Sequence, residues 1–381
     1  MTDAEAAGSA TGQNEFRWIT PEIVLSGAGS FERLPELVDQ LHGRRVVAVT
    51  NRSVAEFSPL LNDLFERLGS TLVGSFAACR EHSPASSIDA VAETVVRSRA
   101  DVVVGIGGGS VCDAIKAATL LLAESTGMIA HIAVPTTLSG AEFTTGIGVT
   151  DDDGGPKKVT VDPRAIPRAV ALDPLVTAWT PPQLWSATGV KAIDHAIEAI
   201  WCRRPHPVMT TLATEGLQRL SQSLVAARDV HDVEARAECQ IGAWMSIVRP
   251  GRSAIRLSHL LAHQVGACWR IPHGLTSAVL LPSVMRYLAP VTLDAQVVIA
   301  QAMGVAPGDN TADTAERAAV HLEQLLGRLE LPTRLRDVVG RDAVSRDVVV
   351  EAVFEEAEYL DCTYDLPLGR VSVAQLMDLA W

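Results

Sequence analysis

The sequence has few of the features that mark secreted, membrane or nucleic-acid-binding proteins. Its six cysteines are scattered and form no Cys-x-x-Cys pair, so they predict neither a disulfide framework nor a thiolate zinc site. Basic residues are in deficit, with 32 Lys and Arg against 45 Asp and Glu, and the net charge of −13 is unfavourable for binding nucleic acid or anionic lipid. No apolar run reaches the length of a membrane span. These absences favour a protein of the reducing cytoplasm with neither nucleic acid nor membrane as a partner.

Residues 1–15 lack the basic and then apolar order of a signal peptide, and we expect them to form a disordered tail. The rest has the composition of a globular enzyme, because 48% of the 381 residues are hydrophobic and 20% are charged. That length suits two domains. Since no repeat or low-complexity linker separates the halves, we expect them to pack rigidly with a site between them.

The chain divides into two segments with different periodicity. Over residues 16–176, short β-branched runs alternate with amphipathic helical segments, which is typical of an α/β domain with a parallel sheet covered on both faces. Over residues 177–381 the periodicity is helical with almost no strand signal, and Pro181-Pro182 opens the first helix. The predicted fold class is therefore α/β followed by all-α. The predicted strands are 45–50, 71–74, 101–106 and 131–134, and two of the predicted helices are 87–97 and 111–123.

Four histidines of the helical half are candidates for a functional site. His259 and His263 are four residues apart, so they share one face of a helix, and His273 follows in a Pro-His-Gly turn that can return to that face. His195 lies upstream in a helical run. Histidine pairs at this spacing hold divalent metals or transfer protons, although a single histidine is more often a satisfied core residue.

A glycine-rich loop predicts a phosphate site in the α/β half. Gly107, Gly108, Gly109 and Ser110 follow the most apolar strand and open a helix. Glycine lets the backbone approach a ligand, and a helix N-terminus offers free N–H groups to a pyrophosphate. The spacing differs from G-x-G-x-x-G, and glycine triplets also occur as plain turns.

A second polar loop follows the next strand and carries Thr136, Thr137 and Leu138. Two such loops at the carboxyl ends of neighbouring strands suit a dinucleotide in a sheet crevice, which makes the first domain Rossmann-like. After the first predicted strand, Asn51 and Arg52 stand where an acidic side chain would hold the ribose 2′-OH of NADH. Asn51 tolerates a 2′-phosphate and Arg52 is available to it, so we expect NADPH to be accepted.

These motifs together resemble the iron-containing (group III) alcohol dehydrogenase family. The resemblance rests on GGGS-x-x-D-x-x-K from Gly107, VPTT-x-x-G from Val134, the His195-Ala-Ile-Glu-Ala helix and the His259, His263 and His273 spacing, in order from about residue 18 to 290. Within the family the chain is most similar to the maleylacetate reductases, on the strings Arg80-Glu81-His82-Ser83-Pro84, TTLSGAE and DPRAIPR. The resemblance implies hydride transfer with NAD(H) or NADP(H) and a homodimer.

The resemblance also implies roles for individual residues. The GGGS loop would cradle the pyrophosphate, Asp113, Thr136, Thr137 and Leu138 would line the adenosine side and ribose, and Lys157 would reach the nicotinamide ribose. His195, His259 and His273 would hold a divalent iron or zinc ion, together with an Asp, while His263 would lie beside the nicotinamide. In this chain the position of that Asp, one helical turn before His195, is Lys191.

An ammonium cannot ligate a metal and repels one, so Lys191 favours a metal-free site in which its own charge polarises the substrate. The alternative is that Lys191 extends to solvent while three histidines hold the metal. The function we predict is reduction of a small carbonyl compound, plausibly an oxo-acid, with His263 or Lys191 supplying the proton. A metal-dependent alcohol or polyol dehydrogenase, a lyase of the dehydroquinate synthase kind, which shares this architecture, and a nucleotide-binding pseudoenzyme are the alternatives.

Overall fold

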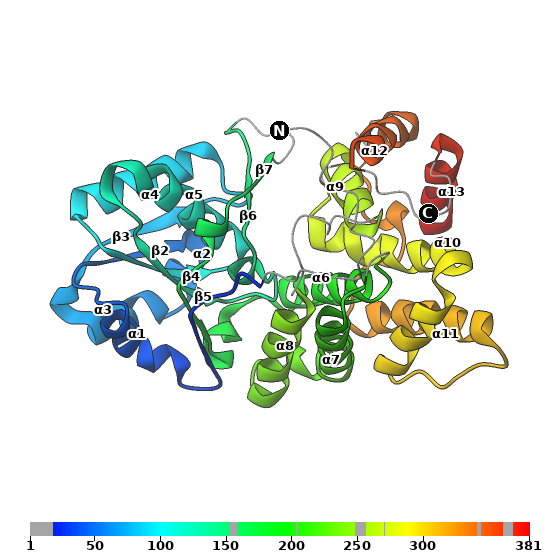
Figure 1. Cartoon of the computed structure of the whole chain (residues 1–381), viewed down its shortest axis with the longest axis horizontal. Coiled ribbons are helices and arrows are strands. Elements are labelled where there is room, and N and C mark those ends of the chain that lie inside the picture. The colour runs from blue at the N-terminus through cyan, green and yellow to red at the C-terminus, as the bar shows by residue number, and fades with distance from the viewer. Residues whose placement is uncertain are drawn as a thin grey trace, which may run out of the picture.

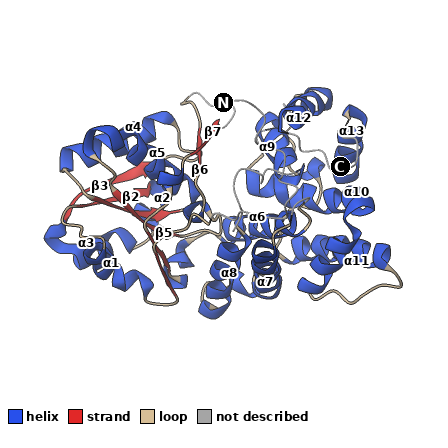
Figure 2. Ribbon diagram, in the orientation of Figure 1, coloured by secondary structure: helices blue, strands red, loops and turns tan. Residues whose placement is uncertain are grey.

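The computed structural model has two parts side by side, a sheet with flanking helices and a helical part (Figure 1). It describes residues 18–152, 158–202, 205–247, 257–269, 271–340, 344–360 and 369–381. All strands lie in the first part, and every described element from residue 182 on is helical (Figure 2). The α/β plus all-α fold class is confirmed. The predicted tail 1–15 and Lys157 lie outside the described residues, and the division at residue 176 stays a prediction.

The sheet has six parallel strands, and four of them are the predicted ones. In sheet order the strands are β1 (Ile23–Ser26), β8 (Ala169–Leu172), β5 (Ala130–Pro135), β4 (Val102–Gly107), β2 (Val46–Asn51) and β3 (Leu72–Cys79). The four-residue strands β1 and β8 were not predicted, because so short an apolar run carries no readable alternation. A separate antiparallel pair, β6 (Gly146–Val149) and β7 (Lys158–Val161), was also not predicted.

Alternating side chains of the central strands bury both faces of the sheet. Val46 and Val102 belong to the apolar cluster on one face of the sheet, whereas Val47 and Val103 belong to the cluster on the opposite face. This explains why these strands read as continuous apolar runs. The helices of this part are α1 (Leu34–Gln40), α2 (Arg52–Phe57), α3 (Leu60–Leu68), α4 (Ala85–Ser98) and α5 (Gly109–Thr126).

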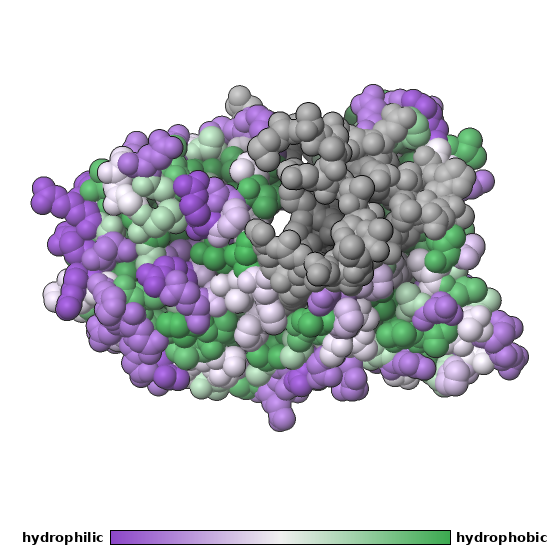
Figure 3. All heavy atoms as spheres, in the orientation of Figure 1, coloured by the Kyte–Doolittle hydropathy of each residue, from purple (hydrophilic) through white to green (hydrophobic). Residues whose placement is uncertain are grey.

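The helical part is built around one large apolar core. Its helix α10 is long and apolar enough to cross a membrane by length and composition, but 61% of its most apolar window is buried in the protein, as expected of a core helix. Figure 3 shows polar side chains gathered on the exposed surface of the α/β part in this view. The described helices are α6 (Pro182–Ile200), α7 (Pro207–Ser223), α8 (Val233–Ser246), α9 (Leu257–Trp269), α10 (His273–Ala302), α11 (Thr311–Arg328), α12 (Arg346–Leu360) and α13 (Arg370–Ala380).

The loop after β5, residues 136–144, joins the two parts. Phe143 stacks on Trp244 of α8 with ring centroids 5.0 Å apart. The backbone of the loop contacts α6 and the segment before it, because Thr180 donates to the carbonyl oxygen of Thr136 at 2.6 Å and the N–H of Leu138 donates to Thr188 Oγ1 at 3.2 Å. This loop therefore fixes the helical part relative to the sheet through these contacts.

A buried lysine fixes the far end of this loop. Lys116 of α5 is completely buried, and its Nζ donates to the carbonyl oxygens of Ala141, Thr144 and Gly146, the last two at 2.7 and 3.0 Å. The Asp113 carboxylate lies 3.9 Å away. Since a buried ammonium is stable only when its protons are satisfied, the loop and the charge stabilise each other.

We expect Lys116→Met to lower the free energy of unfolding by about 3–5 kcal/mol, because three carbonyl oxygens and a carboxylate would lose their buried cation. Chemical denaturation followed by circular dichroism measures this change. Lys158→Met, which removes an exposed lysine paired with Asp151, is the matched control and should change stability by less than about 1 kcal/mol. Equal effects of the two substitutions would show that Lys116 does not fix the loop.

Candidate active site

The glycine loop lies where the sequence predicts a pyrophosphate site. Gly107 ends β4, Gly108 caps α5, and Gly109 and Ser110 form its first turn. A Cβ atom on Gly108 would lie 3.1 Å from the side chain of Thr137, so a larger residue fits only if that side chain shifts. The structure thus brings the predicted GGGS loop and Thr137 into contact at the N-terminus of an 18-residue helix.

A strained turn, not assigned a role by the sequence reasoning, supports this loop. His82 and Ser83 both have left-handed backbone conformations, with φ of 63° and 50°. The N–H of His82 donates to Ser110 Oγ at 3.0 Å, and Ser83 Oγ donates to the carbonyl oxygen of Ser110 at 2.8 Å. Such conformations are costly outside glycine and concentrate at functional sites. No glycine or asparagine marks the turn, so local sequence patterns could not reveal it.

The remaining predicted nucleotide residues of the first part have structural contacts of their own. Asp113 is buried and accepts from the N–H of Gly148 at 3.2 Å. Leu138 is buried in the core of the helical part. The roles predicted for Asp113, Thr136 and Leu138 beside the nucleotide stay predictions.

Asn51 stands at the end of β2 and caps α2, since its side chain accepts from the N–H of Val54 at 2.9 Å. Arg52 is exposed and lies 3.6 Å from Glu56. A surface pair of this kind is weak, so Arg52 remains available to a phosphate group.

The second cluster of the site lies on helices α6 and α9. The rings of His195 and His259 have centroids 6.0 Å apart, and those of His259 and His263 are 5.1 Å apart. His195 is buried, whereas His259 and His263 are half-buried. The predicted convergence of these three imidazoles is therefore present. His273 begins α10, and its side chain lies outside the described part of the chain.

Two further side chains of α6 belong to this cluster by position. Lys191 is half-buried and lies four residues before His195, so the two share one helix face. Glu198, three residues after His195, is buried and accepts from the N–H of His259 at 3.1 Å. This bond holds the start of α9 against α6 and thereby sets the distance between the imidazoles. The sequence reasoning gave Glu198 no role, although its i+3 spacing from His195 indicated the shared face.

The described donors do not complete a metal site of the kind expected for this architecture. Among the described side chains, no three of His, Cys, Asp or Glu lie in an arrangement that could hold a metal ion. Asp194 is fully buried next to His195, and α-helical geometry turns it about 100° away. The residue on the face of His195 is the cation Lys191, which repels a divalent ion. Lys191 is thus unfavourable to a divalent ion at this place, while the side chain of His273, the third predicted ligand, lies outside the described residues, so the metal-free site stays a prediction.

The fold and the candidate site suit an oxidoreductase with a sheet part that carries the glycine loop and a helical part that carries the histidines, and the comparisons with known proteins show the family. Residues 21–174 match the family described as "Iron-containing alcohol dehydrogenase", and residues 185–364 match the "Fe-containing alcohol dehydrogenase family, C-terminal". The chain belongs to the iron-containing alcohol dehydrogenase family. It is an enzyme, and the family uses NAD(P)H.

Individual relatives narrow this assignment. The chain is 31% identical over 315 residues to a maleylacetate reductase of Sphingobium indicum, covering 82% of this chain and 86% of the relative, and 34% identical over 314 residues to maleylacetate reductase 2 of Cupriavidus pinatubonensis, covering 80% and 82%. The crystal structure of maleylacetate reductase from a Rhizobium strain matches with a TM-score of 0.82 at 26% identity, over 97% of this chain and 99% of that one. The protein is thus an oxidoreductase of the maleylacetate reductase kind.

We expect Gly108→Val to weaken binding of NADH and NADPH by more than tenfold, above about 1.4 kcal/mol, because its side chain would press on Thr137 and enter the phosphate position. Titration of nicotinamide fluorescence measures this. Gly327→Val, at a helical position with open space around it, is the control and should bind normally. An unchanged dissociation constant in folded Gly108→Val would remove the pyrophosphate assignment.

We expect wild-type protein to accept NADPH at least as well as NADH, and Asn51→Asp to shift the preference toward NADH by about tenfold, because a carboxylate repels the 2′-phosphate. An aspartate keeps the cap on α2, so the fold should be unaffected. The ratio of the two dissociation constants is the measurement. A wild type that binds only NADH would contradict the assignment of this position.

Proposed function

We propose that the protein reduces the carbonyl group of a small oxo-acid with NADH or NADPH, and that Lys191 takes the place of a catalytic metal. The observation that carries this proposal is a half-buried lysine one helical turn before His195 on α6, while the ring of His195 lies 6.0 Å from that of His259. A cation at that position supports binding of an anionic substrate and polarisation of a carbonyl oxygen. The relatives are named for maleylacetate, an anionic oxo-acid, which is the kind of substrate that a cation would bind.

Different residues of the site bind the dinucleotide, polarise the substrate and supply the proton. The glycine loop and Thr137 bind the dinucleotide, whose reduced nicotinamide supplies a hydride. Lys191 draws electron density from the substrate carbonyl, so that its carbon accepts the hydride. His263 or Lys191 then donates a proton to the resulting oxyanion and leaves an alcohol. Glu198 positions His259 and does not react.

A second candidate is a metal-dependent alcohol or polyol dehydrogenase, favoured by the three histidines at the family's ligand positions. In that case His195, His259 and His273 would hold iron or zinc, and Lys191 would extend to solvent. A lyase of the dehydroquinate synthase kind has no comparable support, because the relatives named are oxidoreductases. By family analogy we also propose a cytoplasmic homodimer.

We expect Lys191→Ala to reduce turnover of oxo-acids at least a hundredfold while nucleotide affinity changes little, because the variant loses the cation that binds and activates the substrate but keeps the nucleotide contacts. Steady-state oxidation of NADPH, screened with small oxo-acids and matched neutral carbonyl compounds, measures this. Lys158→Ala is the control for loss of a lysine. Preference for neutral carbonyl compounds, or full activity of Lys191→Ala, would contradict the proposal.

Lys191→Asp tests the same position by replacing the positive charge with a negative one. A carboxylate one turn before His195 restores the expected ligand set, so the substitution should raise the affinity for zinc or iron. Equilibrium dialysis of the wild type and the variant measures the difference. Equal metal affinity in the two proteins would show that Lys191 is too far from the histidines to affect a metal there.

A further inference from the structure

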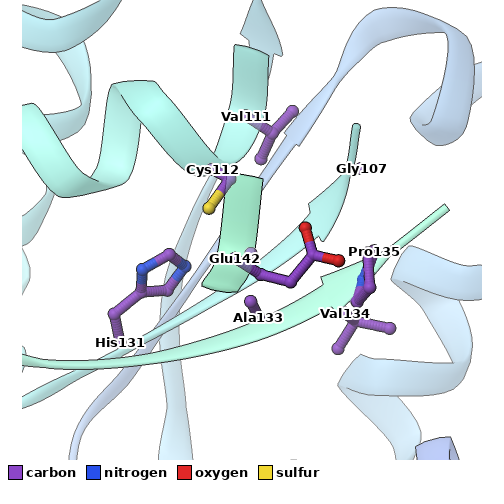
Figure 4. A pocket seen from close by; sticks show the side chains of 9 residues that line it. Gly107, Val111, Cys112, His131, Ala133, Val134, Pro135 and Glu142 are labelled. Carbon is purple, nitrogen blue, oxygen red and sulfur yellow. The ribbon is translucent and has the colours of Figure 1, made fainter. Parts of the chain in front are cut away.

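A small cavity lies directly behind the glycine loop, outside the catalytic cluster (Figure 4). Its lining includes Gly107 and Pro135 at the carboxyl ends of β4 and β5, Cys112 of α5 and His131 of β5. The carboxyl group of Glu142 lies within it, toward Pro135 and Gly107, although Glu142 itself is only 4% exposed. A carboxyl group is therefore buried beneath the loop that would carry the pyrophosphate.

Four titratable side chains surround this carboxyl group, two of them charged and two neutral. Lys116 and Asp113 of α5 are buried beside one another, 3.9 Å apart, and their charges cancel. His131 is buried, and neither ring nitrogen has a hydrogen-bond partner among the described residues. Burial, reinforced by Lys116, lowers the pKa of His131 to about 3, so this imidazole is neutral. Burial raises the pKa of the Cys112 thiol, which is also neutral.

The charge of the cluster therefore depends on Glu142. With its carboxyl group protonated the cluster is neutral, and with it ionised the cluster carries one buried negative charge. The protons of Lys116 bind the carbonyl oxygens of Ala141, Thr144 and Gly146, so Lys116 acts on that charge by Coulomb attraction. Burial raises the pKa of Glu142 to about 7, although a hydrogen bond from its own backbone N–H and the charge of Lys116 act to lower this pKa; Asp113 adds a smaller upward effect. Both forms are thus present near neutral pH.

We propose that Glu142 is a proton-linked positioning residue of the dinucleotide site: only with Glu142 protonated does the neutral cluster behind Gly107 accept the negative pyrophosphate. This rests on the proposed binding of the dinucleotide at the GGGS loop. The buried carboxylate and the pyrophosphate are like charges separated by protein and not by water, so little screening reduces their repulsion. Binding of the nucleotide must then take up a proton.

The direction with pH follows from linkage. Below pH 7 Glu142 is protonated and binding is strongest; as the pH rises through 7 it ionises and the dissociation constant rises. Between pH 6 and 8 the dissociation constant should increase about tenfold. NADH is the suitable probe, because its pyrophosphate does not titrate in this range, whereas the 2′-phosphate of NADPH does.

The test compares NADH binding to wild type, Glu142→Gln and the exposed control Glu93→Gln at pH 6, 7 and 8. Glu142→Gln should bind with the same dissociation constant at all three values, close to that of wild type at pH 6, and Glu93→Gln should retain the tenfold rise. A rise in Glu142→Gln equal to that of wild type, or no rise in wild type, would overturn the proposal.

Calorimetry of the wild type in buffers of different ionisation enthalpy gives a second readout that holds if Glu142→Gln does not fold. Net proton uptake near pH 7 should persist in His263→Asn, and its disappearance there would assign the proton to the histidine cluster instead. Gly108→Val distinguishes failure of the nucleotide site from failure of the role of Glu142. If it leaves NADH binding unchanged, the nucleotide site itself is wrong; if it abolishes binding while wild-type binding is independent of pH, only the role of Glu142 fails.

Discussion

The buried ammonium of Lys116 is the interaction on which the arrangement of this site depends. It holds three backbone carbonyl groups of the segment 141–146 against α5, and through that segment fixes the loop that contacts both the glycine turn and the helical part. Phe143 on this loop stacks against Trp244, so the same loop sets the spacing between the two parts. One satisfied buried charge thus positions the loop that borders the glycine turn and contacts the helical part.

The charge beside the histidine cluster differs from the charge expected for this fold, because a lysine stands where a carboxylate is expected. The architecture supplies converging imidazoles on α6 and α9, held together by the bond from His259 to Glu198. The side chain four residues before His195 is nevertheless a lysine, and we propose that it brings a positive charge where the family's metal site would need a negative one. If a cation is what the reaction requires at this point, a lysine supplies it with no dissociable ion, at the cost of weaker polarisation of the carbonyl oxygen.

Much of this structure could be predicted from local pattern. The strands β2, β3, β4 and β5 are apolar and bounded by helices, and the i, i+4 spacing of His259 and His263 is sufficient to place them on one face. Other features depend on distant contacts. The partners of Lys116 are backbone carbonyls 25 to 30 residues away, and the left-handed turn at His82 and Ser83 is stabilised by Ser110. Neither contact has a sequence signal, and the same holds for the cavity that brings His131 and Glu142 together.

If Lys191 makes a metal unnecessary, wild-type turnover does not depend on a metal, and this dependence can be measured directly. Purified protein would be analysed for iron and zinc, incubated exhaustively with a chelator, and assayed for NADPH oxidation with the best oxo-acid before and after. We expect far less than one metal ion per chain and unchanged turnover after chelation. Stoichiometric metal, with turnover lost on chelation and restored by adding the metal back, would contradict it and make His195, His259 and His273 the ligands.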